Sequence, residues 1–170
     1  MPTIVLSTIV RATRERVFDL ARSIDVHQNS TGGTEERAVA GVTRGLIDMD
    51  DEVTWEARHF GVRQRLTVRV TAFDRPKRFQ DIMISGAFKR MVHDHEFAEG
   101  PARTVMRDRF EFESPLGFLG RMADWLFLAS YMRRFIVCRN EVLRRLAESS
   151  EWSRGGAPSV CLNTVDQPSR

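Results

Sequence analysis

The sequence predicts an α+β fold in which a curved antiparallel β-sheet surrounds one long C-terminal helix. One observation is a run from about Phe118 to Glu148 with helical spacing and apolar residues over most of its circumference. A helix of this kind must be enclosed. The other observation is that the preceding chain supplies mostly strands separated by turn residues, so only a sheet can enclose the helix. A sheet wrapped around a helix commonly leaves a cavity, which favours a binding protein.

The predicted elements follow in order along the chain. β-Branched and aliphatic residues over Thr3–Val10 predict a strand, and Thr13 is a candidate N-cap for a short helix over Arg14–Arg22. A second short helical or irregular piece is expected at Ile24–Ser30, and a modest strand at Glu35–Gly41. Further strands are predicted at Glu52–Phe60, Val62–Phe73, Arg78–Ser85, Phe88–Ala98 and Arg103–Phe112. Together these segments make about six or seven antiparallel strands.

The C-terminal helix is expected to begin after Ser114, a candidate N-cap that is followed by Pro115. Its last turns have ordinary amphipathic spacing, which places Arg139, Arg144 and Arg145 outside. Beyond the helix, glycine, proline and the loss of periodicity predict a flexible tail. The chain is therefore divided into one domain over residues 1–150 and a tail over residues 151–170.

Composition excludes several classes of protein. The chain has 170 residues, of which 42% are hydrophobic and 29% charged, as in an ordinary globular domain. No apolar run approaches the roughly 18 residues of a membrane span, and the N-terminus lacks a signal-peptide pattern. We therefore expect a cytoplasmic protein without stable membrane insertion. The net charge is +3, but the arginines are interspersed with acids, so no nucleic-acid partner is predicted.

Five segments resemble the START and birch-pollen-allergen (SRPBCC, Bet v 1-like) superfamily. They are Val53–Phe60, Phe79–Asp81, Gly86–Lys89, His93–Phe97 and Glu113–Gly117. Within the superfamily, the chain is most similar to a bacterial ligand-binding branch, some of whose members are labelled polyketide cyclase or cell-division inhibitor. The resemblance covers about residues 1–148 and implies a helix-grip fold with a hydrophobic cavity. It implies no particular ligand, and none of the five segments is a catalytic signature.

Strand alternation predicts which side chains face the cavity. The apolar set on each strand should point inward, as Val53, Trp55 and Ala57 do on the strand Glu52–Phe60. Leu126 and Tyr131 are added from the helix. The predicted ligand-binding residues are Trp55, His59, Leu66, Val68, Asp81, Met91, His93, His95, Met106, Asp108, Phe110, Leu126 and Tyr131.

Polar residues accompany the apolar ones to the predicted cavity. His59, His93 and His95, three of the chain's four histidines, fall on inward faces together with Asp108. Asp81 joins them, although the opposite face of its strand is equally apolar. Four interpretations stay open: a hydrogen-bonded cluster that holds the sheet register, a polar pocket end that orients a ligand, acid–base catalysis by His93, His95 or Asp108, and a metal site.

For the metal alternative, His59 would be the third ligand beside His93 and His95. The sequence has no Walker or dinucleotide motif and no nucleophile elbow, so no cofactor and no covalent catalysis are predicted. Cys138 and Cys161 are expected to be reduced thiols.

The leading functional hypothesis is a non-catalytic carrier or sensor of a small hydrophobic molecule such as a lipid, isoprenoid or polyketide-like compound. The alternative is an enzyme of the polyketide aromatase/cyclase type that uses the cavity histidines and aspartate. An interaction protein is a third class. An exposed patch left on the apolar helix would make a homodimer or a membrane-contact site.

Overall fold

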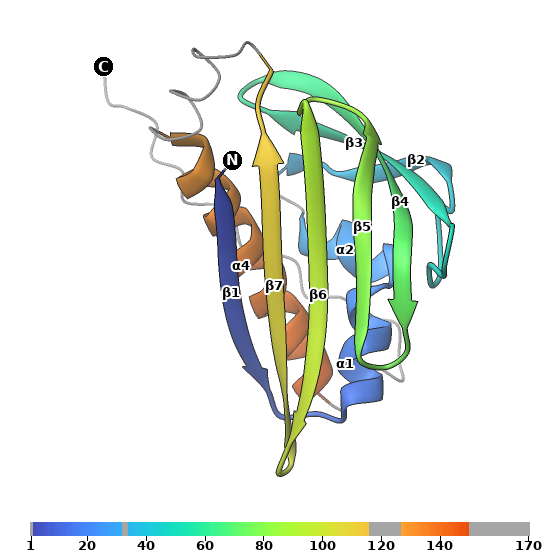
Figure 1. Cartoon of the computed structure of the whole chain (residues 1–170), viewed down its shortest axis with the longest axis vertical. Helices are drawn as coiled ribbons and strands as arrows, with labels where there is room; N and C mark the ends of the chain where they lie inside the picture. Colours follow the sequence, from blue (N-terminus) through green and yellow to red (C-terminus); the bar gives the residue numbers. More distant parts are fainter. Residues whose placement is uncertain (1, 32–33, 116–126, 150–170) are drawn as a thin grey trace.

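The computed structural model describes residues 2–31, 34–115 and 127–149, and it has the predicted helix-grip α+β fold. Seven antiparallel strands form one sheet in the order β1-β7-β6-β5-β4-β3-β2. Figure 1 shows α1, α2 and α4 on one face of this sheet. The strands are β1 (Thr3–Val10), β2 (Arg37–Gly41), β3 (Glu52–His59), β4 (Val62–Asp74), β5 (Arg78–Ser85), β6 (Arg90–Gly100) and β7 (Arg103–Glu113). The helices are α1 (Arg14–Ala21), α2 (Ile24–Ser30) and α4 (Ala129–Glu148).

The strand and helix bounds agree with the sequence prediction except at their ends. Among the strands, β2 begins at Arg37 rather than Glu35, and β6 spans Arg90–Gly100 rather than Phe88–Ala98. The hairpin expected at Gly61 is confirmed: His59 pairs with Val62, so Phe60 and Gly61 form a two-residue turn. Both turn residues have positive φ, 51° and 79°, as a type I′ turn requires.

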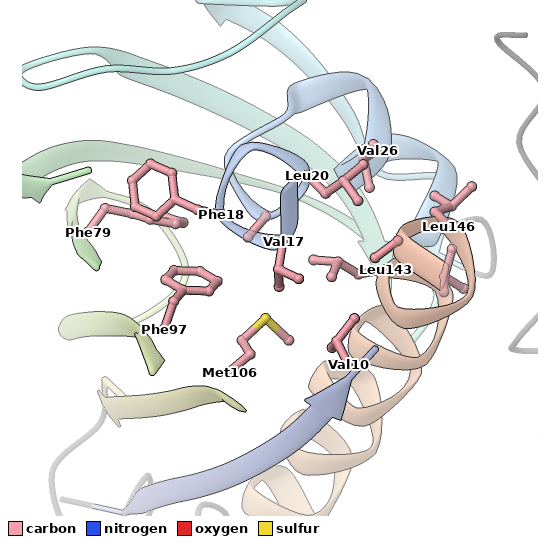
Figure 2. Packing of buried hydrophobic residues seen from close by; sticks show 13 residues of the cluster. Val10, Val17, Phe18, Leu20, Val26, Phe79, Phe97, Met106, Leu143 and Leu146 are labelled. Atoms are coloured by element: carbon pink, nitrogen blue, oxygen red, sulfur yellow. The ribbon is translucent and has the colours of Figure 1, made fainter. Parts of the chain in front are cut away.

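The hydrophobic core fills the space between α1, the later turns of α4 and one end of the sheet. Its centre is Phe18 on α1, which is fully buried and contacts the rings of Phe73, Phe79 and Phe97 edge-on. Figure 2 shows Phe18 beside Phe79 and Phe97. Val10 and Met106 come from the adjacent strands β1 and β7, and Leu143 comes from α4. This end of the sheet is therefore solidly packed against helices.

The described part of α4 is less enclosed than the sequence predicts. Phe127, just before the helix, is 52% exposed and Val137 is 48% exposed. The prediction that the helix is enclosed over most of its circumference is therefore wrong for this part of α4. The reason is that α1 and α2 pack only against the later turns, where Leu143 and Leu146 are buried. The predicted beginning of this helix near Phe118 lies outside the described residues, as does the predicted tail over residues 151–170.

Arg139 is a second correction, because it is 6% exposed and not on the outer face of α4. It follows Ile136 by three residues and precedes Leu143 by four, so helical periodicity places it on the inward stripe. Its charge is tolerated because Nη2 donates a hydrogen bond to the carbonyl of Ala21 at 2.9 Å. Arg145, by contrast, is exposed as predicted and pairs with Glu141. No helix among the described residues is long and apolar enough to cross a membrane.

Phe18→Ala tests the packed core. It should lower the unfolding free energy by about 3–5 kcal/mol, because it removes a buried ring and leaves a cavity. Phe60→Ala is the matched control: Phe60 is 60% exposed at the hairpin tip, and its loss should cost less than about 1 kcal/mol. Urea denaturation measures both values. Equal losses for the two variants would contradict the packing described above.

Candidate functional site

A cavity of about 300 Å³ lies between the sheet and the first described turns of α4. Val53, Trp55 and Leu66 line it from β3 and β4, and Met132, Phe135 and Ile136 line it from α4. The helix residues are spaced three and one apart, so they share one stripe that faces the sheet. The cavity wall is therefore mainly apolar, and many of its polar side chains belong to two groups, with Gln64, Arg65 and Ser114 outside them.

Most of the predicted ligand-binding residues lie on the cavity wall. These are Trp55, His59, Leu66, Val68, Asp81, Met91, His93, His95, Phe110 and Tyr131. Met106 and Asp108 do not line it, although they share a strand face with Phe110. Met106 lies at the packed end of the sheet, and Asp108 lies behind the two histidines. Leu126 lies outside the described residues.

The first polar group, which we call the inner cluster, consists of Asp81, His93, His95 and Asp108. Asp81 on β5 pairs in register with His93 on β6, and His95 pairs with Asp108 on β7. The Asp108 oxygen Oδ1 lies 3.2 Å from His93 Nε2 and 2.9 Å from His95 Nδ1. His95 Nε2 lies 3.4 Å from Asp81 Oδ1. The ring of His95 is thus bracketed by two carboxylates.

Two α4 residues hold Asp108 from the other side. Asn140 Nδ2 donates a hydrogen bond of 2.6 Å to Asp108 Oδ2. Arg139 Nη1 lies 3.8 Å from Asp108 Oδ1, close enough for an electrostatic contribution but not for a hydrogen bond. The side chain of Asp108 has no solvent exposure, so these partners replace water around a buried charge.

The inner cluster shifts the pKa values of its two histidines in opposite directions. Burial, and then the charge on His95, lowers the pKa of His93 to about 4. Burial also disfavours charge on His95, but the contacts with Asp108 and Asp81 outweigh it and raise the pKa of His95. The two histidines hold the pKa of Asp108 well below its usual range despite its burial. His93 therefore loses its proton at a lower pH than His95 does.

The second polar group, the outer cluster, consists of His27, Glu36, His59 and Tyr131. His27 Nε2 lies 3.2 Å from Glu36 Oε2, and the His27 ring stacks on Trp55 with centroids 4.2 Å apart. His59 Nδ1 and the Tyr131 hydroxyl are 2.7 Å apart. Burial opposes ionisation of Glu36, but His27 and His59 nevertheless lower the Glu36 pKa.

The sequence prediction missed His27, Glu36 and Arg139 as cavity residues. For His27 a signal exists, because it follows the buried Ile24 by three residues and so lies on the same face of α2. Glu36 precedes β2 without any periodic pattern that would place it.

The metal alternative with His59 as third ligand is wrong. His59 contacts Tyr131 instead, and the group in the described residues whose ligand atoms converge is Asp81, His93 and His95. One ligand atom from each of these residues lies within 4.8 Å of the others.

Comparison with known proteins identifies the fold. No protein-family model and no curated protein sequence matches the chain. Among solved structures, TTHA0849 from Thermus thermophilus is 20% identical with a TM-score of 0.72, covering 88% of this chain and all (100%) of that one. A START superfamily protein from Mycobacterium smegmatis is 13% identical with a TM-score of 0.65, covering 84% of this chain and 97% of that one.

The aromatase/cyclase StfQ of the steffimycin biosynthetic pathway has two domains. It is 15% identical with a TM-score of 0.59, and the match covers 89% of this chain and 46% of StfQ. The structural similarity shows that the chain has the fold of the START and Bet v 1-like (SRPBCC) proteins. The expected superfamily fold is thereby confirmed.

The lowered pKa of His93 predicts a pH-dependent stability. Between the unfolded value of 6.5 and the folded value of about 4, the unfolded chain binds more protons at this site. The unfolding free energy should therefore fall as pH falls through this window, by on the order of 3 kcal/mol.

His93→Gln should flatten this pH dependence, and His27→Gln should keep most of it, in chemical denaturation measured across the window. An unchanged slope in His93→Gln would show that another group carries the effect.

Proposed function

We propose that this protein binds a small, mainly hydrophobic molecule in the cavity between the sheet and α4. The observation that supports this function is the cavity itself: about 300 Å³, with an apolar wall and polar side chains gathered in two clusters. Ligand pockets in proteins combine a mainly apolar lining with a few placed polar groups, and this volume is at the small end of their range of about 300–1,000 Å³.

The position of the two clusters indicates what kind of molecule fits. The inner cluster offers the imidazole of His95, whose pKa is raised, and the guanidinium of Arg139 lies beside the cluster, both on the cavity wall. His59 and Tyr131 of the outer cluster lie on β3 and α4, and Tyr131 contacts Phe60, which is exposed like its neighbour Phe127. A guest with an oxygen atom at its inner end and an apolar body against Leu66 and Met91 would satisfy the inner N–H groups while remaining desolvated.

Trp55 reports on occupancy, because its indole lines the cavity and is 7% exposed. In a Trp125→Phe/Trp152→Phe background, titration with a fluorescence-silent fatty acid or isoprenoid should shift Trp55 emission saturably. Val68→Phe should weaken the apparent affinity at least about tenfold, since the ring occupies guest volume. Arg69→Phe is the control, because the neighbouring residue on β4 is exposed on the other face of the sheet.

Saturable emission changes of equal affinity in both variants would place the guest outside the cavity. Absence of any emission change, together with native mass spectra that contain only the bare chain, would contradict the proposed function.

The inner cluster favours one second candidate, an enzyme of the aromatase/cyclase type. His93 and His95 have ring centroids 3.9 Å apart and pKa values displaced in opposite directions. Such a pair supplies a general base and a general acid in one place. In an aldol cyclisation, His93 in its neutral form would take the proton from the carbon between two ketones, and His95 in its protonated form would protonate the ketone oxygen that is attacked.

For this candidate, His93→Gln should lower kcat for cyclisation of a poly-β-ketone thioester by about 10²–10⁴-fold with little change in KM. His59→Gln removes a cavity histidine of the outer cluster and should leave kcat nearly unchanged. Product analysis by liquid chromatography measures both. No turnover by the native protein, or equal turnover by His93→Gln, would reject the enzyme.

A further inference from the structure

Hydrogen bonds within the inner cluster leave the ring nitrogens of His95 without well-aligned partners. His95 Nδ1 is buried and, although 2.9 Å from Asp108, has no aligned hydrogen bond. The other nitrogen, Nε2, lies 3.4 Å from Asp81 Oδ1 and makes an electrostatic contact only. Nε2 thus faces a carboxylate oxygen without an aligned hydrogen bond, and an ion bound between these two atoms would give both of them a partner.

The spacing of Asp81, His93 and His95 fits a metal ion. Nitrogen and oxygen ligands bind zinc at about 2.0–2.2 Å, which places neighbouring ligand atoms of a tetrahedral site roughly 3.4 Å apart. The 3.4 Å between His95 Nε2 and Asp81 Oδ1 equals this separation. The largest distance within the group, at most 4.8 Å, requires only a small side-chain adjustment. The strand register supplies this convergence without any contribution from loops.

Asp108 occupies the position of an outer carboxylate. It contacts His93 Nε2 and His95 Nδ1, so the ring nitrogens that do not contact Asp108 are His93 Nδ1 and His95 Nε2. A histidine that binds a metal almost always gives its other ring nitrogen to a carboxylate or carbonyl, which fixes the orientation of the ring. Here one buried carboxylate serves both rings, and Asn140 holds that carboxylate in place.

We propose that Asp81, His93 and His95 bind a single divalent transition-metal ion, with zinc as the ion that best fits two imidazoles and one carboxylate. In the bound form the ion replaces the proton between His95 Nε2 and Asp81. All three ligands line the cavity, so the fourth coordination position faces it. This last step rests on the proposed function: the fourth position would accept an oxygen atom of the guest, from a carboxylate or from a chelating pair of ketone and hydroxyl groups.

The test is zinc binding by the full-length chain after chelator treatment, in a Cys138→Ser/Cys161→Ser background that removes thiol ligands. Isothermal titration should give one Zn²⁺ per chain, and excess Mg²⁺ should not compete. His95→Gln and Asp81→Asn should each weaken zinc binding by more than about tenfold. His59→Gln is the matched control: it removes a cavity histidine outside the group and should bind zinc like the parent.

Asp108→Asn tests whether Asp108 orients the two histidines or binds the ion directly. It should weaken zinc binding about 10–100-fold while stoichiometry stays at one. With Co²⁺ in place of zinc, the parent should show a visible absorption band that His95→Gln lacks. Circular dichroism checks that each variant is folded.

Absence of stoichiometric zinc in the parent, or parent-like binding in both folded variants His95→Gln and Asp81→Asn, would overturn the metal site. Trp55 emission with a hydrophobic guest, measured on the same metal-free samples, separates the two proposals. If a guest binds to the protein but zinc does not, the metal site is rejected and the proposed function stands. If zinc binds but no guest does, the proposed function is rejected and the metal site stands.

Discussion

The arrangement of the cavity depends on one buried charge, the carboxylate of Asp108 on β7. An ionised carboxylate without water costs several kcal/mol unless it is paired, so its surroundings must supply partners. They come from two directions: His93 and His95 on β6, and Asn140 on α4. Asn140 also donates to Thr8 on β1, so the same contacts join the helix to both strands at this edge of the sheet. The distance between α4 and the sheet is thus fixed where the cavity ends.

The face of the sheet is divided into a packed half and a hollow half. In the packed half, α1 places Phe18 against three rings, and the later turns of α4 add Leu143. In the hollow half the first described turns of α4 and the helix α2 cover the strands, and the α4 side chains toward the sheet are mostly half-buried. Stability and binding therefore come from different parts of one domain. Substitutions that change the cavity need not weaken the core.

The sequence predicted the fold well because the fold depends on local patterns. Alternation along the strands and the turn at Gly61 depend on nearby residues, and both agree with the structure. Alternation also placed His93 and His95 on the cavity face. It could not separate Phe110 from Met106, since both share one strand face and differ only in what packs above them.

The residues that sequence reasoning misplaced depend on tertiary contacts. Arg139 was expected outside because arginine is rarely buried, and only the carbonyl of Ala21 and the charge of Asp108 make its position tolerable. Glu36 falls at the start of the strand predicted over Glu35–Gly41 but precedes β2 in the structure, and its partner His27 comes from a different element. Pairings of this kind depend on which elements the tertiary fold brings together, so a single sequence gives little sign of them.

The pairing of β1 with β7 also determines when the protein can fold. Thr3 lies opposite Glu111, so the first strand can join the sheet only after the last strand has been synthesised. Until then the growing chain has an unpaired N-terminal strand whose Ile4 and Leu6 are buried only in the folded protein. Contacts between residues so distant in sequence slow folding, because the entropy of closing the long loop is lost before the contacts form. Synthesis on the ribosome would therefore be the stage at which this chain most needs a chaperone.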